Sequence, residues 1–188
     1  VVPVLTEFLA RHPEVTVDLT LNDRFVDLVD EGYDVVVRVG RLADSSLVAR
    51  RLAGCPVLLC AAPAYLERAG RPVHPADLAR HQCIGCRSGP GGSLYRWTFE
   101  RAGETVTLDV AGTLVTDDAD LMLHAALSGI GLWHGVDHIA QPMIDAGRLL
   151  RVLADWSPTY PGFHLYYAAG APLSPAVRAV VDVLRGGD

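Results

Sequence analysis

The two segments Val15-Thr-Val-Asp-Leu-Thr-Leu21 and Asp34-Val-Val-Val-Arg-Val-Gly40 decide the fold class. Apolar and polar side chains alternate in the first segment, which predicts a half-buried strand. The second segment is a short apolar run, which predicts a strand covered on both faces. Between them Asp23 is a candidate N-cap and Gly32 a C-terminal stop, so this stretch is predicted to be a helix. Strand, helix and strand in this order predict a parallel sheet with right-handed crossovers, and therefore an α/β domain.

The rest of the chain repeats these patterns, more loosely in the second half. Apolar residues three and four apart, with caps at their ends, predict helices, and short apolar or alternating runs predict strands. Two α/β lobes fit this order of elements better than one large sheet. The predicted helices are 1–11, 63–70, 75–80, 118–128, 136–146 and 176–185, and the further strands are 47–52, 55–62, 95–100, 105–109, 110–115, 130–133, 148–153 and 163–168.

The composition excludes several classes of function. The chain has 188 residues, of which 50% are hydrophobic, and this is enough to bury a core in one or two compact domains. With 16 basic residues against 22 acidic ones the net charge is −6, so the chain is not expected to bind DNA unaided. All the basic residues are arginine. The absence of lysine removes Schiff-base chemistry, the phosphate-loop lysine and Ser-Lys hydrolysis.

Four cysteines and the absence of a signal-peptide pattern indicate a cytoplasmic chain with reduced thiols. No apolar run approaches the ~18 residues that a membrane span needs, so no membrane contact is expected. The first residue is not Met and already belongs to an amphipathic pattern. We therefore expect the chain to be a fragment of a longer protein.

The pair Cys83-Ile-Gly-Cys86 has the spacing of redox and zinc motifs. A zinc ribbon would need a second such pair, which Cys55 and Cys60 do not supply, and thioredoxin-like catalysis would need the motif at a helix start. In an extended segment this spacing sends the two side chains to opposite faces. The favoured interpretation is two small buried side chains on a connecting strand.

Two histidines four residues apart, in His134-Gly-Val-Asp-His138, have the spacing of a metal-binding helix, with Asp137 as a third candidate ligand. The glutamate that does the chemistry in helical zinc proteases is missing, and Gly135 favours a turn over a helix. A polar strand end that faces a cleft is the favoured interpretation. No metal is expected.

Arg38 stands within an apolar run, so its charge needs a carboxylate partner or a cleft. Arg41 lies just beyond the carboxyl end of the same predicted strand, where open α/β sheets bind their ligands. Pairing with Asp34, Asp44 or another structural carboxylate is the alternative for both arginines.

The segment Thr116-Asp-Asp118 begins a predicted helix, and helix starts attract polar or anionic ligand groups. Capping of the helix alone is the alternative. The glycines at 89–92 lack the Lys and Ser/Thr of a phosphate loop, and the glycines at 129–131 are too few for a dinucleotide fingerprint, so no cofactor is expected. No Gly-x-Ser-x-Gly motif is present, and we do not expect an enzyme.

An ordered series of segments along nearly the whole chain resembles the effector-binding domain of LysR-type transcriptional regulators. This series is far more specific than any single motif in it. The segments are 8–19, 27–40, 45–52, 60–66, 74–78, 125–131, 147–149 and 173–178.

The resemblance implies two Rossmann-like lobes of the type 2 periplasmic-binding-protein kind, joined by two crossover strands. Lobe I would comprise residues 1–83 and 169–188, and lobe II residues 84–168. The family's winged helix-turn-helix, its linker helix and the first strand of lobe I would all be missing from this chain. The implied function is to bind a small organic effector in the cleft between the lobes and so to modulate DNA binding by the missing N-terminal domain.

The resemblance also implies which residues line this cleft. They come from the first helix, the end of the third strand, a crossover strand, a helix start and a further strand end. The family usually has aliphatic residues and proline at 133–135, so Trp133 and His134 would add a stacking ring and a titratable group at the cleft mouth. We therefore hypothesise an aromatic or conjugated effector, while the nearby arginines favour a carboxylate. The implied effector-binding residues are Val1, Val2, Gly40, Arg41, Leu42, Gly85, Cys86, Arg87, Thr116, Asp117, Asp118, Trp133, His134 and Gly135.

Family members also pair as antiparallel dimers, which here would bring residues 2–11 and 15–21 of one chain against 118–128 of another. We expect a homodimer in which effector binding shifts the orientation of the lobes. The alternatives are a free-standing solute-binding protein and, less favoured, a small enzyme that uses His134 or Cys86.

Overall fold

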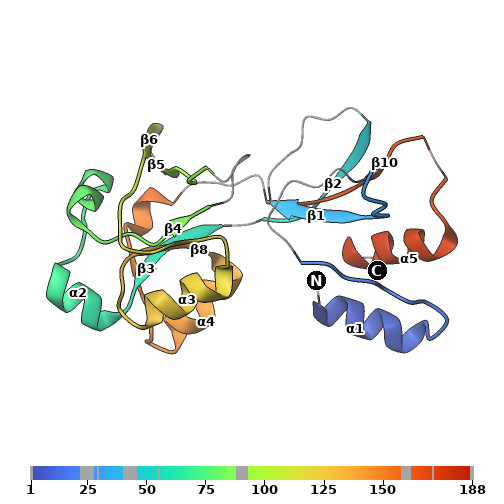
Figure 1. Ribbon diagram of the computed structural model, residues 1–188, viewed down its shortest axis with the longest axis horizontal. Coiled ribbons are helices and arrows are strands. Elements are labelled where there is room, and N and C mark those ends of the chain that lie inside the picture. Colours follow the sequence, from blue (N-terminus) through green and yellow to red (C-terminus); the bar gives the residue numbers. More distant parts are fainter. Residues whose placement is uncertain are drawn as a thin grey trace. The chain divides into compact units, whose positions relative to one another are not determined.

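The chain forms two units in the computed structural model, which describes residues 2–21, 28, 30–39, 46–54, 56–87, 93–157, 162–170 and 172–186. Unit 1 comprises Val1–Gly54 and Pro161–Asp188, and unit 2 comprises Cys55–Tyr160 (Figure 1). The predicted boundaries, at 83/84 and 168/169, differ from these. Among the described residues, the strand Val57–Ala61 pairs with strands of unit 2 and the strand Phe163–Ala168 with strands of unit 1, so the chain changes unit before each of these strands.

Unit 1 has a three-stranded antiparallel sheet in the order β1-β10-β2. Its strands are β1 (Val36–Val39), β2 (Leu47–Ala53) and β10 (Phe163–Ala168). Helices α1 (Val2–Arg11) and α5 (Pro175–Leu184) pack against each other beside this sheet (Figure 1). The first and last helices of the chain therefore share one core, in which Leu5, Phe8 and Val181 are buried.

The predicted strand at 15–21 does not form, and this prediction is wrong. Residues 15–21 belong to no strand, and Leu19 and Leu21 are 50% and 85% exposed. Alternation indicates which side chains would share a face, but a strand also needs a neighbouring backbone to pair with. Strand β1 pairs antiparallel with β10, so the described residues show no parallel unit at this point. The predicted helix at 23–32 falls mainly outside the described residues.

Unit 2 is built around β3, whose backbone pairs antiparallel with β8 on one side and β9 on the other. A parallel bridge between Cys83 and Leu132 connects β8 to a further parallel pair, β4 and β7. Strands β5 and β6 form a separate hairpin. The strands are β3 (Val57–Ala61), β4 (Gly85–Cys86), β5 (Trp97–Arg101), β6 (Glu104–Leu108), β7 (Val115–Thr116), β8 (Trp133–Val136) and β9 (Leu150–Val152).

Most of the predicted elements of unit 2 are confirmed, with two shifts. Strand β7 covers only the end of the predicted strand 110–115, and β8 begins where the predicted strand 130–133 ends. The helices agree with prediction, although the second is a 3₁₀ helix. They are α2 (Pro63–Ala69), η1 (Pro75–Arg80), α3 (Ala119–Leu127) and α4 (Asp137–Asp145). A further short 3₁₀ helix, η3 (Ala154–Trp156), was not predicted. No helix within the described ranges is long and apolar enough to cross a membrane.

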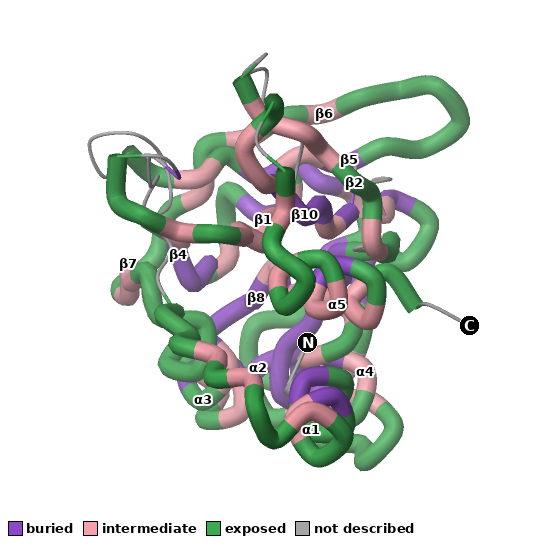
Figure 2. The backbone as a smooth tube through the Cα atoms, turned by 90° about the vertical axis from the view of Figure 1, so that its right-hand side faces the viewer, coloured by how far each residue is buried: buried purple, intermediate pink, exposed green. Residues whose placement is uncertain are grey.

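Two hydrophobic cores lie on opposite faces of β3. Leu59 and Ala61 belong to the first core, with Trp97, Phe99 and Trp156, and the alternate residues Leu58 and Cys60 belong to the second core. Successive side chains of a strand point to opposite faces, so one buried strand supplies both cores. In β8, next to β3, buried and half-buried residues alternate, whereas the turn of the β5–β6 hairpin is exposed (Figure 2).

Gly131 allows the backbone before β8 to approach the segment before β4. The amide of Leu132 donates to the carbonyl of Gln82 at 2.8 Å, and the amide of Ile84 donates to the carbonyl of Leu132 at 2.9 Å. A Cβ atom on residue 131 would lie 2.4 Å from the oxygen of Gln82. A side chain at this position would therefore separate the two segments.

We expect Gly131→Ala to lower the free energy of unfolding by about 1–3 kcal/mol, because the backbone on both sides must shift to admit the methyl group. Urea unfolding followed by circular dichroism measures this change. The control is Ile130→Ala, since Ile130 is 42% exposed and its loss should change the free energy by only about 0.5 kcal/mol. Equal effects of the two substitutions would contradict the close approach.

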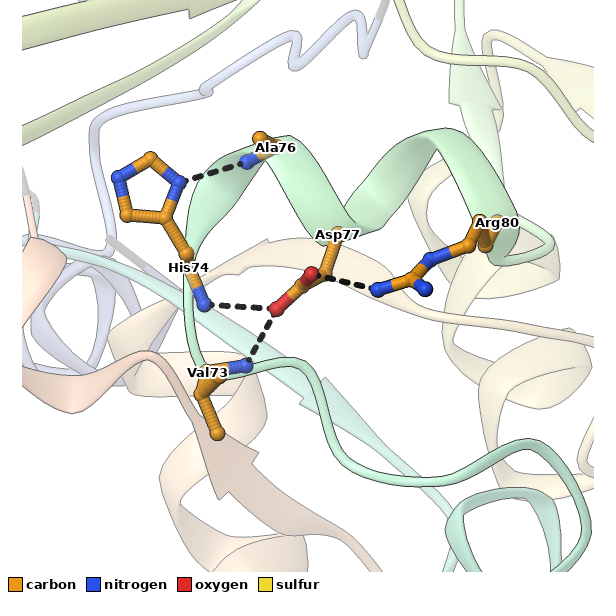
Figure 3. Close-up of polar contacts among 5 residues, drawn as sticks. All are labelled: Val73, His74, Ala76, Asp77 and Arg80. Atoms are coloured by element: carbon orange, nitrogen blue, oxygen red, sulfur yellow. Dashed lines mark hydrogen bonds and ion pairs between the residues drawn. The ribbon is translucent and has the colours of Figure 1, made fainter.

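The helix η1 begins with a reciprocal cap made by His74 and Asp77 (Figure 3). Nδ1 of His74 accepts a hydrogen bond from the amide of Ala76 at 3.1 Å. One carboxylate oxygen of Asp77 accepts from the amides of Val73 and His74, both at 3.0 Å, and the other accepts from Arg80 at 2.8 Å. The amide hydrogen bonds, reinforced by Arg80, hold the pKa of Asp77 below its usual value.

We expect Asp77→Asn to lower the thermal midpoint at pH 7, because a neutral amide accepts these hydrogen bonds less strongly than a carboxylate. Because the pKa of Asp77 is lower in the folded chain than its usual value of 3.8, the carboxylate stabilises the folded chain when the pH is above 3.8. This stabilisation is lost as the pH falls through the lowered pKa. The difference in thermal midpoint between the parent chain and Asp77→Asn should therefore decrease as the pH falls. Thermal unfolding from pH 7 to pH 3 measures the gap, and Glu67→Gln, on the exposed face of α2, is the charge-matched control. A gap independent of pH would contradict the role of the carboxylate.

Candidate functional site

Two of the predicted segments pair at one edge of unit 2, and a third begins near them. Strands β4 and β7 are parallel, with Gly85 opposite Val115 and Cys86 opposite Thr116. The amide of Arg87 continues this pairing by donating to the carbonyl of Thr116 at 3.0 Å. A parallel bridge between Cys83 and Leu132 holds the residue before β8 beside the segment before β4, but β4 and β8 belong to different sheets. The carboxyl ends of β4 and β7 therefore lie together, which is where open α/β sheets bind ligands.

Helix α3 begins at this edge, and two side chains cap its start. Oδ1 of Asp118 accepts a hydrogen bond from the amide of Leu121 at 2.7 Å, and Oγ1 of Thr116 accepts from the amide of Asp118 at 3.1 Å. Asp117 and Asp120 are exposed beside this cap. The carboxylates already use the positive end of the helix, so this edge favours ligand groups that donate hydrogen bonds over anions.

The two cysteines of the Cys83–Cys86 pair lie on opposite faces, as the spacing predicts. Cys83 belongs to the first core, whereas Cys86 is half-buried against the second. Burial raises the pKa of the Cys60 and Cys83 thiols to about 12 in each case. A thiolate is needed for nucleophilic attack or metal binding, so both behave as small apolar side chains.

Trp133 and His134 lie in the two cores, which is at odds with the predicted ring and titratable group at a cleft mouth. Trp133 is 3% exposed, within the second core, and a Cβ atom on Gly135 would lie 2.4 Å from its ring. His134 points to the other face, where its ring centroid lies 5.2 Å from that of Trp97 and 5.3 Å from that of Phe99. The sequence analysis did not identify Trp97 and Phe99 as neighbours of His134, although their alternation in β5 places both on one buried face.

Burial also removes the charge that His134 is predicted to bring. Both ring nitrogens are buried, and this burial lowers the pKa of His134 to about 3. The imidazole is therefore neutral near pH 7. His138 begins the first turn of α4 while His134 lies in β8, so the two are not on one helix face. Across the described residues, no three His, Cys, Asp or Glu side chains come together in a group that could hold a metal.

The remaining predicted site residues belong to unit 1. Val1, Gly40, Arg41 and Leu42 lie outside the described residues, and Val2 is described only as the first residue of α1. Arg38 is half-buried in β1, opposite His164 of β10.

Comparison with known proteins identifies the family. The model of the LysR substrate binding domain family matches residues 1–187, and the chain belongs to this family. It is 37% identical over 186 residues to an uncharacterized HTH-type transcriptional regulator, YcaN, of Escherichia coli, covering 98% of this chain and 60% of YcaN. It is 34% identical to an HTH-type transcriptional regulator of Xanthomonas campestris, covering 98% of this chain and 54% of that protein. The chain thus spans little more than half the length of these relatives.

Solved structures agree with the family assignment. The regulatory domain of AphB from Vibrio vulnificus is 28% identical with a TM-score of 0.83, covering 100% of this chain and 91% of that one. The full-length Vibrio cholerae virulence activator AphB, a member of the LTTR protein family, is 26% identical with a TM-score of 0.85, covering 98% of this chain and 62% of that one. The predicted fold class, α/β and periplasmic-binding-protein-like, is confirmed.

The neutral state of His134 has a consequence for acid stability. In the unfolded chain His134 takes up a proton as the pH falls below its usual pKa of 6.5, whereas in the folded chain it stays neutral down to about pH 3. The free energy of unfolding therefore decreases as the pH falls through this range. We expect His134→Leu to remove this uptake of about one proton, so that the free energy of unfolding changes less steeply with pH between pH 6 and pH 4. Urea midpoints across this range measure the slope. A variant slope equal to that of the parent chain would contradict the buried, neutral imidazole.

Proposed function

We propose that this chain is the effector-sensing part of a LysR-type transcriptional regulator and that it binds a small organic molecule. The observation that supports the proposal is the parallel pairing of β4 with β7, which brings the predicted segments 85–87 and 116–118 together, in a chain that belongs to the LysR substrate binding domain family. Further contacts would come from the predicted positions at Val1, Val2 and 40–42. Trp133 and His134 would support the strand end from the two cores instead of touching the effector.

The polar groups at this edge indicate which effector would fit. Asp117 is exposed, and the side chains of Thr116 and Asp118 already accept hydrogen bonds from backbone amides. A ligand group that donates hydrogen bonds, such as an amide, hydroxyl or amine, suits these acceptors. The aromatic effector hypothesised from Trp133 loses its support, because that ring is buried.

The signal would pass to DNA through a part of the protein outside this chain. The relatives are described as HTH-type transcriptional regulators, and this chain spans 60% of YcaN. A net charge of −6 does not favour binding of DNA by this chain alone, so we assign DNA binding to a separate N-terminal domain in a cytoplasmic homodimer. Effector binding would then shift a conformational equilibrium, with no covalent chemistry.

A free-standing solute-binding protein of the same fold is the second candidate, and a signal peptide encoded upstream would favour it. A small enzyme that uses Cys86 or His134 is less favoured, since His134 is buried and neutral near pH 7. A helix-turn-helix of about ninety codons upstream would favour the regulator over both.

We expect a thermal-shift screen of this chain against small organic acids, amino acids and aromatic compounds to find a ligand that raises the midpoint. A ligand at 100 times its dissociation constant adds roughly 2.7 kcal/mol of stability. Thr116→Val should raise the dissociation constant of that ligand about fivefold to tenfold, because it removes a hydroxyl that orders the helix start.

The matched control is Thr107→Val, which removes a hydroxyl from β6, away from this edge. Equal binding by Thr116→Val and Thr107→Val would place the ligand elsewhere. Turnover of the ligand, measured by mass spectrometry, would overturn the sensor in favour of the enzyme.

A further inference from the structure

The exposed face of helix α5 carries two opposite charges that are not paired with each other. Arg178 and Asp182 are both exposed, and side chains four residues apart on a helix are neighbours on one face. Among the ion pairs that the structure gives for its described residues, Arg178 takes part in none. Asp182 lies 4.0 Å from Arg185, and its side chain is 61% exposed. Both charges are therefore open to a partner from outside the helix.

The two charges are also placed against the dipole of their own helix. The start of a helix attracts negative charge and its end attracts positive charge. Arg178 lies near the start of α5 and Asp182 near its end, and α5 has no acidic residue in its first turn and no basic residue in its last turn. In α1 the order is the favourable one, and Arg11 lies 2.7 Å from Glu7. Helix α5 alone therefore leaves both charges poorly compensated.

A second α5 that runs antiparallel to the first would compensate both charges. A two-fold axis between Arg178 and Asp182 brings Arg178 of each copy beside Asp182 of the other copy, so the surface is complementary to itself. Each carboxylate then also lies near the start of the facing helix, where its negative charge is favourable. One pair of side chains thus supplies two ion pairs between the copies.

The surface beside these charges is hollowed and has apolar walls. A hollow of about 390 Å³ is lined by Leu173, Pro175, Arg178, Ala179 and Asp182. The distance between two packed helices depends on the side chains at their contact, and the small side chain of Ala179 allows a close approach. Leu173 and Pro175 offer apolar surface that a second helix would remove from water. The hollow therefore suits the side chains of a facing helix.

We propose that α5 is a self-association surface, on which the α5 helix of a second copy of this chain docks in antiparallel orientation. This surface is separate from the one predicted for the homodimer, which uses 2–11, 15–21 and 118–128. Exposed ion pairs are individually weak and are screened by salt, so the association depends on protein concentration and on ionic strength. Effector binding does not require this contact, so the proposal holds or fails independently of the function proposed above.

The test follows the mass of this chain by sedimentation and its amide chemical shifts over about a hundredfold range of concentration. We expect the average mass to rise with concentration, the amides of 175–185 to shift with it, and added sodium chloride to reverse both changes. Shifts confined to 2–11 and 118–128 would assign the association to the predicted homodimer surface and would overturn the proposal. A mass that does not change with concentration would leave the hollow to a different partner and would also overturn it.

Charge exchange identifies the contact. Arg178→Asp should raise the dissociation constant of the association about tenfold, because two ion pairs between the copies become two repulsions. A negative charge near the start of α5 suits the helix dipole, so the variant should stay folded, which its thermal midpoint checks.

Adding Asp182→Arg to Arg178→Asp exchanges the two charges and restores the complementarity, so the dissociation constant should return to within about twofold of the parent value. The matched control is Arg96→Asp, which reverses an exposed charge in unit 2 and should leave the association unchanged. The proposal is overturned by an association that Arg178→Asp leaves intact, that the double variant does not restore, or that Arg96→Asp weakens equally.

Discussion

Burial of β3 on both of its faces is the constraint on which unit 2 depends. All five of its residues are buried, and its alternate side chains enter two different cores. Both of its edges are also occupied, by β8 and β9. Because no face or edge of this strand is free, strands β8 and β9, which pair with it, have fixed positions relative to it.

The candidate site follows from this arrangement and from two close approaches of the backbone. Gly131 brings the start of β8 against Gln82, and Gly112 brings the segment before β7 against Cys83, where a Cβ atom would lie 2.1 Å from the carbonyl oxygen. These glycines let parallel backbones meet without side chains between them. Strands β4 and β7 therefore end together, and the capped start of α3 follows β7.

The sequence by itself determined the family, through the resemblance of an ordered series of segments along the chain. It also determined the α/β class, nearly all the helices and most strands, since these follow from local periodicity and from caps such as Asp118. It also determined that Cys83 and Cys86 face opposite ways. Only the tertiary structure decided that 15–21 pairs with no strand, that the units divide at 54/55 and 160/161, and that Trp133 and His134 are buried. Strand pairing, unit boundaries and burial depend on residues distant in sequence, and periodicity within one segment carries no information about its neighbours.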